Sequence, residues 1–226
     1  MIPPSAHPSP TTAKRERRKE ARPGELLEAA LELFVEKGFA ATRVDEVAAR
    51  AGVSKGTLFL YFPSKEELFK AVVRENIAGR FAEWALEVDT FEGSTSELLR
   101  YCYKVWWERI GRTKASGITK LMLSEAHHFP EITQFYQHEV IRPGQMLIRC
   151  ILQRGVDRGE FRALDMDYAI YLVLAPMLFL MLWKHSMGAC VPDALGLEPE
   201  KYIAMQADNI LQGLVVRPPS PSSPPG

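Results

Sequence analysis

Residues 44–63 read VDEVAARAGVSKGTLFLYFP, and this stretch decides the fold. Val47 and Ala51 lie on one face of a short helix, and Gly52 follows where a turn requires a backbone that other side chains resist. Ser54 is suited to cap a second short helix that ends before the proline. Two short helices joined by a glycine turn are typical of a helix-turn-helix, whose second helix enters the major groove of DNA. The same spacing also fits a helical hairpin without a ligand.

Helical periodicity continues on both sides of this stretch. Five apolar residues follow the spacing of one helix face, namely Leu26, Ala29, Ala30, Leu33 and Phe34. Gly38 ends that first helix, and Thr42 is expected to cap the helix that follows it. Beyond the proline, Ser64 and Glu67 have the spacing of a capping box and predict the start of a long fourth helix.

The remaining chain predicts five more helices and no sheet, because it has no sustained alternation of apolar and polar residues. These helices are expected over about 94–111, 114–128, 130 onward with a kink at Pro143 and Gly144, 165–187 and 199–213. The sequence therefore predicts an all-α fold of about nine helices. A small helix-turn-helix domain precedes a larger helical domain.

The composition is that of an ordinary globular chain, with 226 residues and 46% hydrophobic residues. It excludes a disordered chain, a collagen and a disulfide miniprotein. The 28 basic and 28 acidic side chains balance, but residues 1–22 carry six bases and two acids. We expect disorder in the Pro- and Ser-rich residues 1–12 and 215–226. The basic run 13–22 is expected to form an arm in which some of Lys14, Arg15, Arg17 and Arg18 touch DNA.

Other classes of protein have little support in the sequence. The three cysteines have no metal-binding spacing and suit a reduced, cytoplasmic compartment. The apolar run 169–183 is shorter than the ~20 residues of a membrane-spanning helix, so a buried helix is expected and a membrane-associated protein is the alternative. Nucleophile-elbow, zinc-protease and phosphate-loop motifs do not occur in the sequence, which predicts neither an enzyme nor a cofactor.

Residues 26–69, LLEAALELFVEKGFAATRVDEVAARAGVSKGTLFLYFPSKEELF, resemble the DNA-binding domain of the TetR family of bacterial transcription regulators. The resemblance implies a DNA-binding domain over residues 23–70, with its helix-turn-helix at about 43–62. It also implies an effector-binding and dimerisation domain over 71–214. Such a protein is expected to be a cytoplasmic homodimer that binds a palindromic operator in double-stranded DNA and leaves it when a small hydrophobic or aromatic effector binds. An activator of the same fold is the alternative.

The resemblance also implies nine residues that contact DNA: Thr42, Arg43, Ser54, Lys55, Gly56, Thr57, Leu60, Tyr61 and Lys65. Thr42, Arg43, Tyr61 and Lys65 are expected at backbone phosphates, whereas Lys55, Gly56 and Thr57 face the groove. Leu60 either contacts a thymine methyl group or packs within the protein.

Aromatic and methionine side chains are frequent after residue 80, and they suit either a helix-bundle core or an apolar effector pocket. The pocket residues expected here are Trp84, Tyr103, Trp106, Trp107, Met122, His127, Phe135, Met177 and Met181. Residues 172–183 are expected at the dimer interface. Glu125 and His128, with His127, Glu131 and His138 nearby in sequence, are a weak metal pattern, and no metal is expected.

Overall fold

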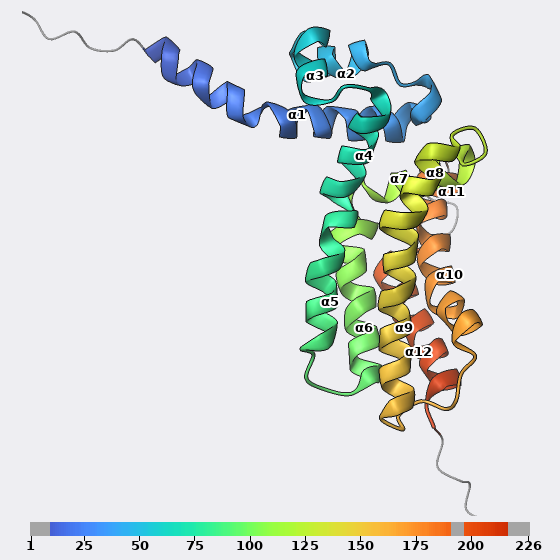
Figure 1. Ribbon diagram of the computed structural model, residues 1–226. Coiled ribbons are helices and arrows are strands. Elements are labelled where there is room, and N and C mark those ends of the chain that lie inside the picture. Colours follow the sequence, from blue (N-terminus) through green and yellow to red (C-terminus); the bar gives the residue numbers. More distant parts are fainter. Residues whose placement is uncertain (1–9, 191–196, 217–226) are drawn as a thin grey trace, which may run out of the picture. The chain divides into compact units, whose positions relative to one another are not determined.

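The computed structural model describes residues 10–190 and 197–216, and Figure 1 shows their arrangement as helices. These ranges contain twelve α-helices, one 3-10 helix and two π-helical turns. The one β-type contact among them is an isolated bridge between Phe161 and Val215. The prediction of an all-α fold is therefore confirmed. The chain divides into two compact units, Met1–Val72 and Val73–Gly226.

The first unit holds α1 (Pro10–Ala41), α2 (Val44–Arg50), α3 (Lys55–Tyr61) and the start of α4 (Lys65–Asn76). Three fully buried phenyl rings, those of Phe34, Phe39 and Phe69, join α1 to α4. Their ring centroids lie 5.2–5.6 Å apart, as stacked and edge-to-face pairs. Such pairs contribute ~0.5–1.5 kcal/mol each beyond the burial of their area. This cluster is the centre of the small core on which α2 and α3 are held.

The ends of α1 differ from the sequence prediction. The helix begins at Pro10 and continues through Pro23, so the basic run 13–22 lies on helical backbone and not on an unstructured arm. Gly38 interrupts the helix as expected, with a φ of 85°. The disorder predicted for residues 1–9 and 217–226 lies outside the described residues.

Thr42 is not the cap of α2, which corrects the sequence prediction. Arg43 occupies the N-cap position with an extended backbone and no capping hydrogen bond from its side chain. The Thr42 hydroxyl lies instead 2.6 Å from the carbonyl oxygen of Gly38 and 3.1 Å from that of Leu33. It therefore bonds back to the end of α1.

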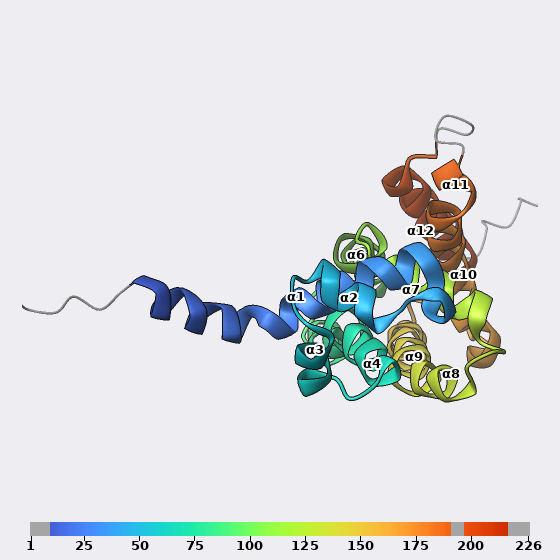
Figure 2. The same cartoon turned by 90° about the horizontal axis from the view of Figure 1, so that it is seen from above.

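The second unit is a helical bundle. Its elements are η1 (Ala78–Arg80), α5 (Phe81–Asp89), α6 (Thr95–Trp106), η2 (Trp107–Gly111), α7 (Ser116–Glu125), α8 (Pro130–Tyr136), η3 (Gln137–Ile141), α9 (Arg142–Asp157), α10 (Met166–His185), α11 (Met187–Cys190) and α12 (Pro199–Leu214). Helix α9 packs against α5, α6 and α10, while α12 packs against α6 and α10. Figure 2 views α6 and α9 nearly end-on.

Two helix breaks differ from the sequence prediction. The long fourth helix ends at Asn76, and η1 separates it from α5. At Gly79 a Cβ atom would lie 2.9 Å from the carbonyl oxygen of Arg74, so the chain bends where glycine permits close backbone approach. The expected kink near Pro143 takes the form of the π-helical turn η3, which leads directly into α9 and places this proline in the first turn of α9. Runs such as α8, η3 and α9 therefore correspond to one predicted helix.

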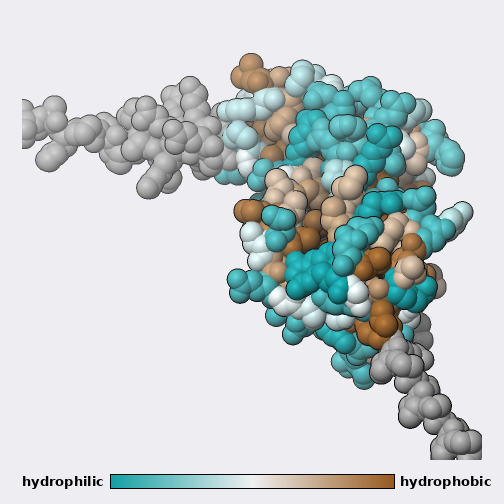
Figure 3. Space-filling model, turned by 60° about the horizontal axis from the view of Figure 1, so that its bottom comes forward, coloured by the Kyte–Doolittle hydropathy of each residue, from teal (hydrophilic) through white to brown (hydrophobic). Residues whose placement is uncertain are grey.

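Helix α10 is the most apolar element of the bundle. Within the described ranges, the segment Met166–Cys190 alone is long and apolar enough to cross a bilayer by length and composition. It packs on α7, α9 and α12, and buries Val173, Leu180 and Met181. Other apolar side chains remain exposed, and on the face drawn in Figure 3 brown apolar areas interrupt the teal polar surface.

Candidate nucleic-acid interface and ligand cavity

The turn between α2 and α3 forms as its sequence predicts. Gly52 has a φ of 67°, and a Cβ atom there would meet nothing within 4 Å, so the backbone conformation alone favours glycine. The Val53 amide donates to the carbonyl oxygen of Ala48 at 2.9 Å and closes the turn. The Ser54 hydroxyl accepts from the Thr57 amide at 3.1 Å and caps α3. These contacts fix the start of α3 relative to α2.

One face of α3 is open to solvent. Leu58 is fully buried, while the residues on the opposite side are exposed. Leu60 is 85% exposed, so the alternative in which it packs inside the protein is wrong for this chain. Lys55 extends along the helix, with its ammonium 5.9 Å from the Phe59 ring. Gly56 leaves open space at the beginning of α3, since the atom nearest to an added Cβ would be the Ser54 hydroxyl oxygen at 3.8 Å.

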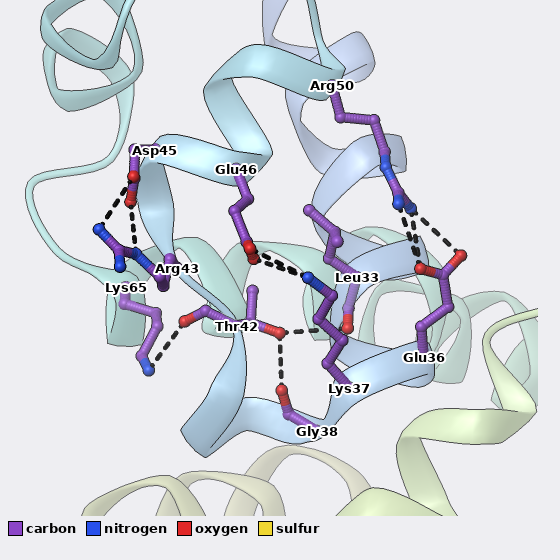
Figure 4. Close-up of polar contacts among 10 residues, drawn as sticks. All are labelled: Leu33, Glu36, Lys37, Gly38, Thr42, Arg43, Asp45, Glu46, Arg50 and Lys65. Carbon is purple, nitrogen blue, oxygen red and sulfur yellow. Dashed lines mark hydrogen bonds and ion pairs between the residues drawn. The ribbon is translucent and has the colours of Figure 1, made fainter.

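Arg43 presents an exposed guanidinium beside this face. It binds Asp45 with two hydrogen bonds, from Nε at 3.2 Å and Nη2 at 3.1 Å (Figure 4). The hydrogen bond from Arg43 lowers the pKa of the Asp45 carboxyl. Because exposed ion pairs stabilise little in water, a phosphate can replace Asp45 as the partner at small cost.

Lys65 and Thr42 do not point their polar groups toward solvent, contrary to expectation. The Lys65 ammonium donates to the carbonyl oxygens of Phe39 at 2.8 Å and Thr42 at 3.1 Å, with Ala40 at 3.3 Å. It also lies 4.4 Å from the Phe39 ring centroid. Thr42 is 1% exposed. These groups hold the first turn of α4 against the end of α1 (Figure 4), which replaces the phosphate contacts expected of their side chains.

Ion pairs hold α2 on α1. Lys37 bonds both carboxylate oxygens of Glu46 at 3.0 Å, and Arg50 bonds Glu36 at 3.1 Å with Glu32 at 3.5 Å (Figure 4). The sequence places these glutamates on one face of the first helix, but it gave no signal that Arg50 binds them. The ion pairs orient α2, and through the turn they orient α3.

The second unit contains a cavity of about 340 Å³. Six of the nine expected pocket residues line it: Trp84, Tyr103, Trp106, Met122, Met177 and Met181. Its wall also includes residues that the sequence prediction missed, among them Phe81, Thr119, Tyr136 and Tyr171. A cavity of this size and apolar character is typical of small-molecule sites.

Three expected pocket residues lie outside the cavity wall. The Trp107 indole donates to the Glu200 carboxylate at 2.8 Å and joins η2 to α12. The Phe135 ring lies under the Arg74 guanidinium, 4.9 Å from the ring centroid. His127 is exposed. The sequence could not separate Trp106 from Trp107, because the π-helical turn that begins at Trp107 changes which side of the helix each residue faces.

The polar groups of the wall are mostly satisfied within the protein. The Tyr103 hydroxyl donates to the carbonyl oxygen of Val173 at 2.7 Å, and burial raises the pKa of Tyr103. Glu87 accepts from Arg109 at 2.8 Å and from the Tyr101 hydroxyl at 3.1 Å. Burial raises the pKa of the Cys102 thiol to about 12, which keeps it protonated. Among residues 10–190 and 197–216, no three His, Cys, Asp or Glu side chains meet in a metal-binding group.

Comparisons with known proteins agree with this architecture. The family described as "Bacterial regulatory proteins, tetR family" matches residues 26–72. The "Tetracyclin repressor-like, C-terminal domain" matches residues 92–193. The transcriptional repressor KstR2 of Mycolicibacterium smegmatis is 28% identical over 194 residues, which cover 85% of this chain and 92% of that protein.

Solved structures share the fold. The fatty acid degradation regulator FadR from Bacillus halodurans has a TM-score of 0.67 and 21% identity, over 84% of this chain and 94% of that one. FadR from Bacillus subtilis, solved with stearoyl-CoA, has a TM-score of 0.60 and 18% identity, over 84% and 97%. With two family descriptions matching in order along more than half of its length, the chain belongs to the TetR family of bacterial transcription regulators and is a DNA-binding regulator, not an enzyme.

Proposed function

We propose that this chain is a cytoplasmic, homodimeric repressor that binds a palindromic operator and releases it when a small apolar effector binds. The observation that carries the proposal is the cavity of about 340 Å³ in the unit that lacks the helix-turn-helix. The names of two relatives support it, since KstR2 is a transcriptional repressor and Bacillus subtilis FadR was solved with stearoyl-CoA.

The exposed face of α3 is the proposed reading surface. Lys55, Gly56, Thr57 and Leu60 lie at the major groove, where Leu60 contacts a thymine methyl group. Arg43 and Tyr61 bind phosphate oxygens on either side. Ser54 is retained at the interface as the cap that sets the start of α3. The basic run 13–22 follows the phosphate backbone and adds affinity without sequence preference.

The outer face of α10 is the proposed dimer interface. Its exposed residues Tyr168, Leu172, Ala175, Phe179 and Leu182 are spaced four, three, four and three apart, which places them on one helix face. Tyr168 is 75% exposed, and Met205 on α12 is exposed as well. Such an apolar row costs free energy in water unless a partner covers it. A two-fold axis would pair α10 and α12 with their copies in a four-helix interface.

Effector release follows from differential affinity. An effector that binds better to one arrangement of the dimer shifts the population toward that arrangement. Two recognition helices bind successive major grooves only when they lie about one DNA turn apart, ~34–36 Å. An arrangement with a different spacing therefore binds the operator more weakly.

The test begins with selection of binding sequences from random double-stranded DNA by the full chain. We expect selected sequences with two-fold symmetry and half-sites one helical turn apart. In titrations with the selected DNA, Lys55→Ala is expected to weaken binding at least tenfold. The matched control Lys104→Ala, an exposed lysine on α6, is expected to change nothing. Selected sequences without symmetry, or equal affinity of both variants, would contradict the proposal.

A further inference from the structure

The cavity wall is suited to a particular charge on its ligand. Glu87 is its one formally charged side chain, and no Lys, Arg or His belongs to the wall among the residues described. Glu87 already accepts hydrogen bonds from Arg109 and Tyr101, so its negative charge is held in place. An anionic group entering this cavity would lose its water, meet no cation and lie near a carboxylate. Transfer of an unpaired charge into such surroundings is strongly unfavourable.

The wall also holds hydrogen-bond donors that the protein does not use. The indole N–H of Trp84 is buried and has no hydrogen-bond partner. The hydroxyls of Thr119 and Tyr136 lie 3.1 Å apart and are both buried. Two hydroxyls contain two hydrogens, and the bond between them uses one, so one O–H remains to donate. Buried donors without partners are unusual in folded proteins, and a ligand oxygen would satisfy them.

From these two features we infer that the effector is an uncharged, mainly apolar molecule carrying at least one acceptor oxygen, such as a ketone or an ester. The oxygen accepts from Trp84 or from the Thr119–Tyr136 hydroxyl pair, and the apolar body fills the rest of the cavity. The volume of about 340 Å³ corresponds to roughly eleven water-sized units at ~30 Å³ each. This inference rests on the proposed function only in naming the bound molecule an effector.

Three probes of nearly equal size test the inference on the full-length protein without DNA. Methyl octanoate has an acceptor and no charge, octanoate has a charge, and nonane has neither. Calorimetric titration is expected to show methyl octanoate binding at least tenfold more tightly than octanoate, and severalfold more tightly than nonane. Octanoate binding as tightly as the ester would overturn the inference, and so would absence of binding by all three probes.

Substitutions identify the donor. Trp84→Phe removes the N–H and keeps an aromatic ring, while Tyr136→Phe removes one hydroxyl of the pair. We expect at least one of them to weaken ester binding roughly three- to tenfold without changing nonane binding. Trp183→Phe, at a tryptophan outside the cavity wall, is the matched control and should change neither. Unchanged ester affinity in both cavity variants would contradict the assigned acceptor, and the wild-type comparison of probes decides the charge if a variant fails to fold.

A separate measurement distinguishes this inference from the proposed function. If methyl octanoate binds as expected but leaves the selected DNA bound, release by effector is wrong while the chemistry of the cavity stands.

Discussion

Lys65 distinguishes a phosphate-binding lysine from a structural one. Its ammonium donates to three backbone carbonyl oxygens, two of which are partly buried. Lys65→Met keeps the apolar stem of the side chain and removes these donors. Hydrogen bonds from a charged group contribute ~1.5–3 kcal/mol, and the carbonyl oxygens left behind would have to find water. We therefore expect the free energy of unfolding of the first unit to fall by about 2 kcal/mol.

Hydrogen exchange reports on this unit separately from the rest of the chain. A loss of about 2 kcal/mol corresponds to roughly thirtyfold faster exchange of the most protected amides in residues 26–72. The salt dependence of DNA binding should stay unchanged, because no phosphate contact is lost. Arg43→Met is the matched comparison, with unchanged exchange and a shallower log–log salt slope by about 0.9 for each phosphate contact. Unchanged exchange together with a shallower slope in Lys65→Met would refute the structural role.

Three further predictions concern the turn, the dimer and the pH dependence. Gly52→Ala is expected to destabilise the first unit by about 1 kcal/mol because of its positive φ, while Gly24→Ala within helix α1 should stabilise it, and equal exchange rates would contradict this. Leu172→Glu should convert the dimer to a monomer in light scattering, whereas Leu86→Glu on α5 should not; a dimer in both would place the interface elsewhere. Burial lowers the pKa of His185 to about 4, with further lowering by Lys184 and Lys120, so the folded state favours the neutral ring. Its contribution to stability is therefore present above pH ~6.5 and is lost as the pH falls toward 4, and His185→Gln should flatten this part of the stability curve in acid titrations of unfolding.

The sequence predicted features that depend on neighbouring residues. The turn at Gly52, the cap at Ser54 and the break at Gly38 each arise within a few positions, and all three are present. Ser64 likewise accepts from the Glu67 amide at 3.1 Å at the start of α4. Local backbone preferences of glycine and serine are sufficient for such predictions.

Features that depend on distant partners were not predictable. Lys65 bonds carbonyl oxygens that lie 23–26 residues earlier in the chain, so nothing near it in sequence distinguishes it from a surface lysine. Trp107 bonds Glu200, which lies 93 residues later. The cavity wall depends on the π-helical turns η2 and η3, which shift the helix face that follows them. A regular helical repeat cannot anticipate such shifts.

Helix α10 has two surfaces with different partners. Its inner residues, including Val173, Met177 and Met181, belong to the cavity wall, while Leu172 and Phe179 lie in the exposed row. In the proposed assembly, one rigid element would therefore touch the ligand on one side and the second subunit on the other. Thermodynamic reciprocity then requires that any change in self-association caused by ligand be matched by an equal change in ligand affinity caused by self-association. The apparent affinity for ligand would accordingly depend on protein concentration, with its midpoint at the dissociation constant of the dimer.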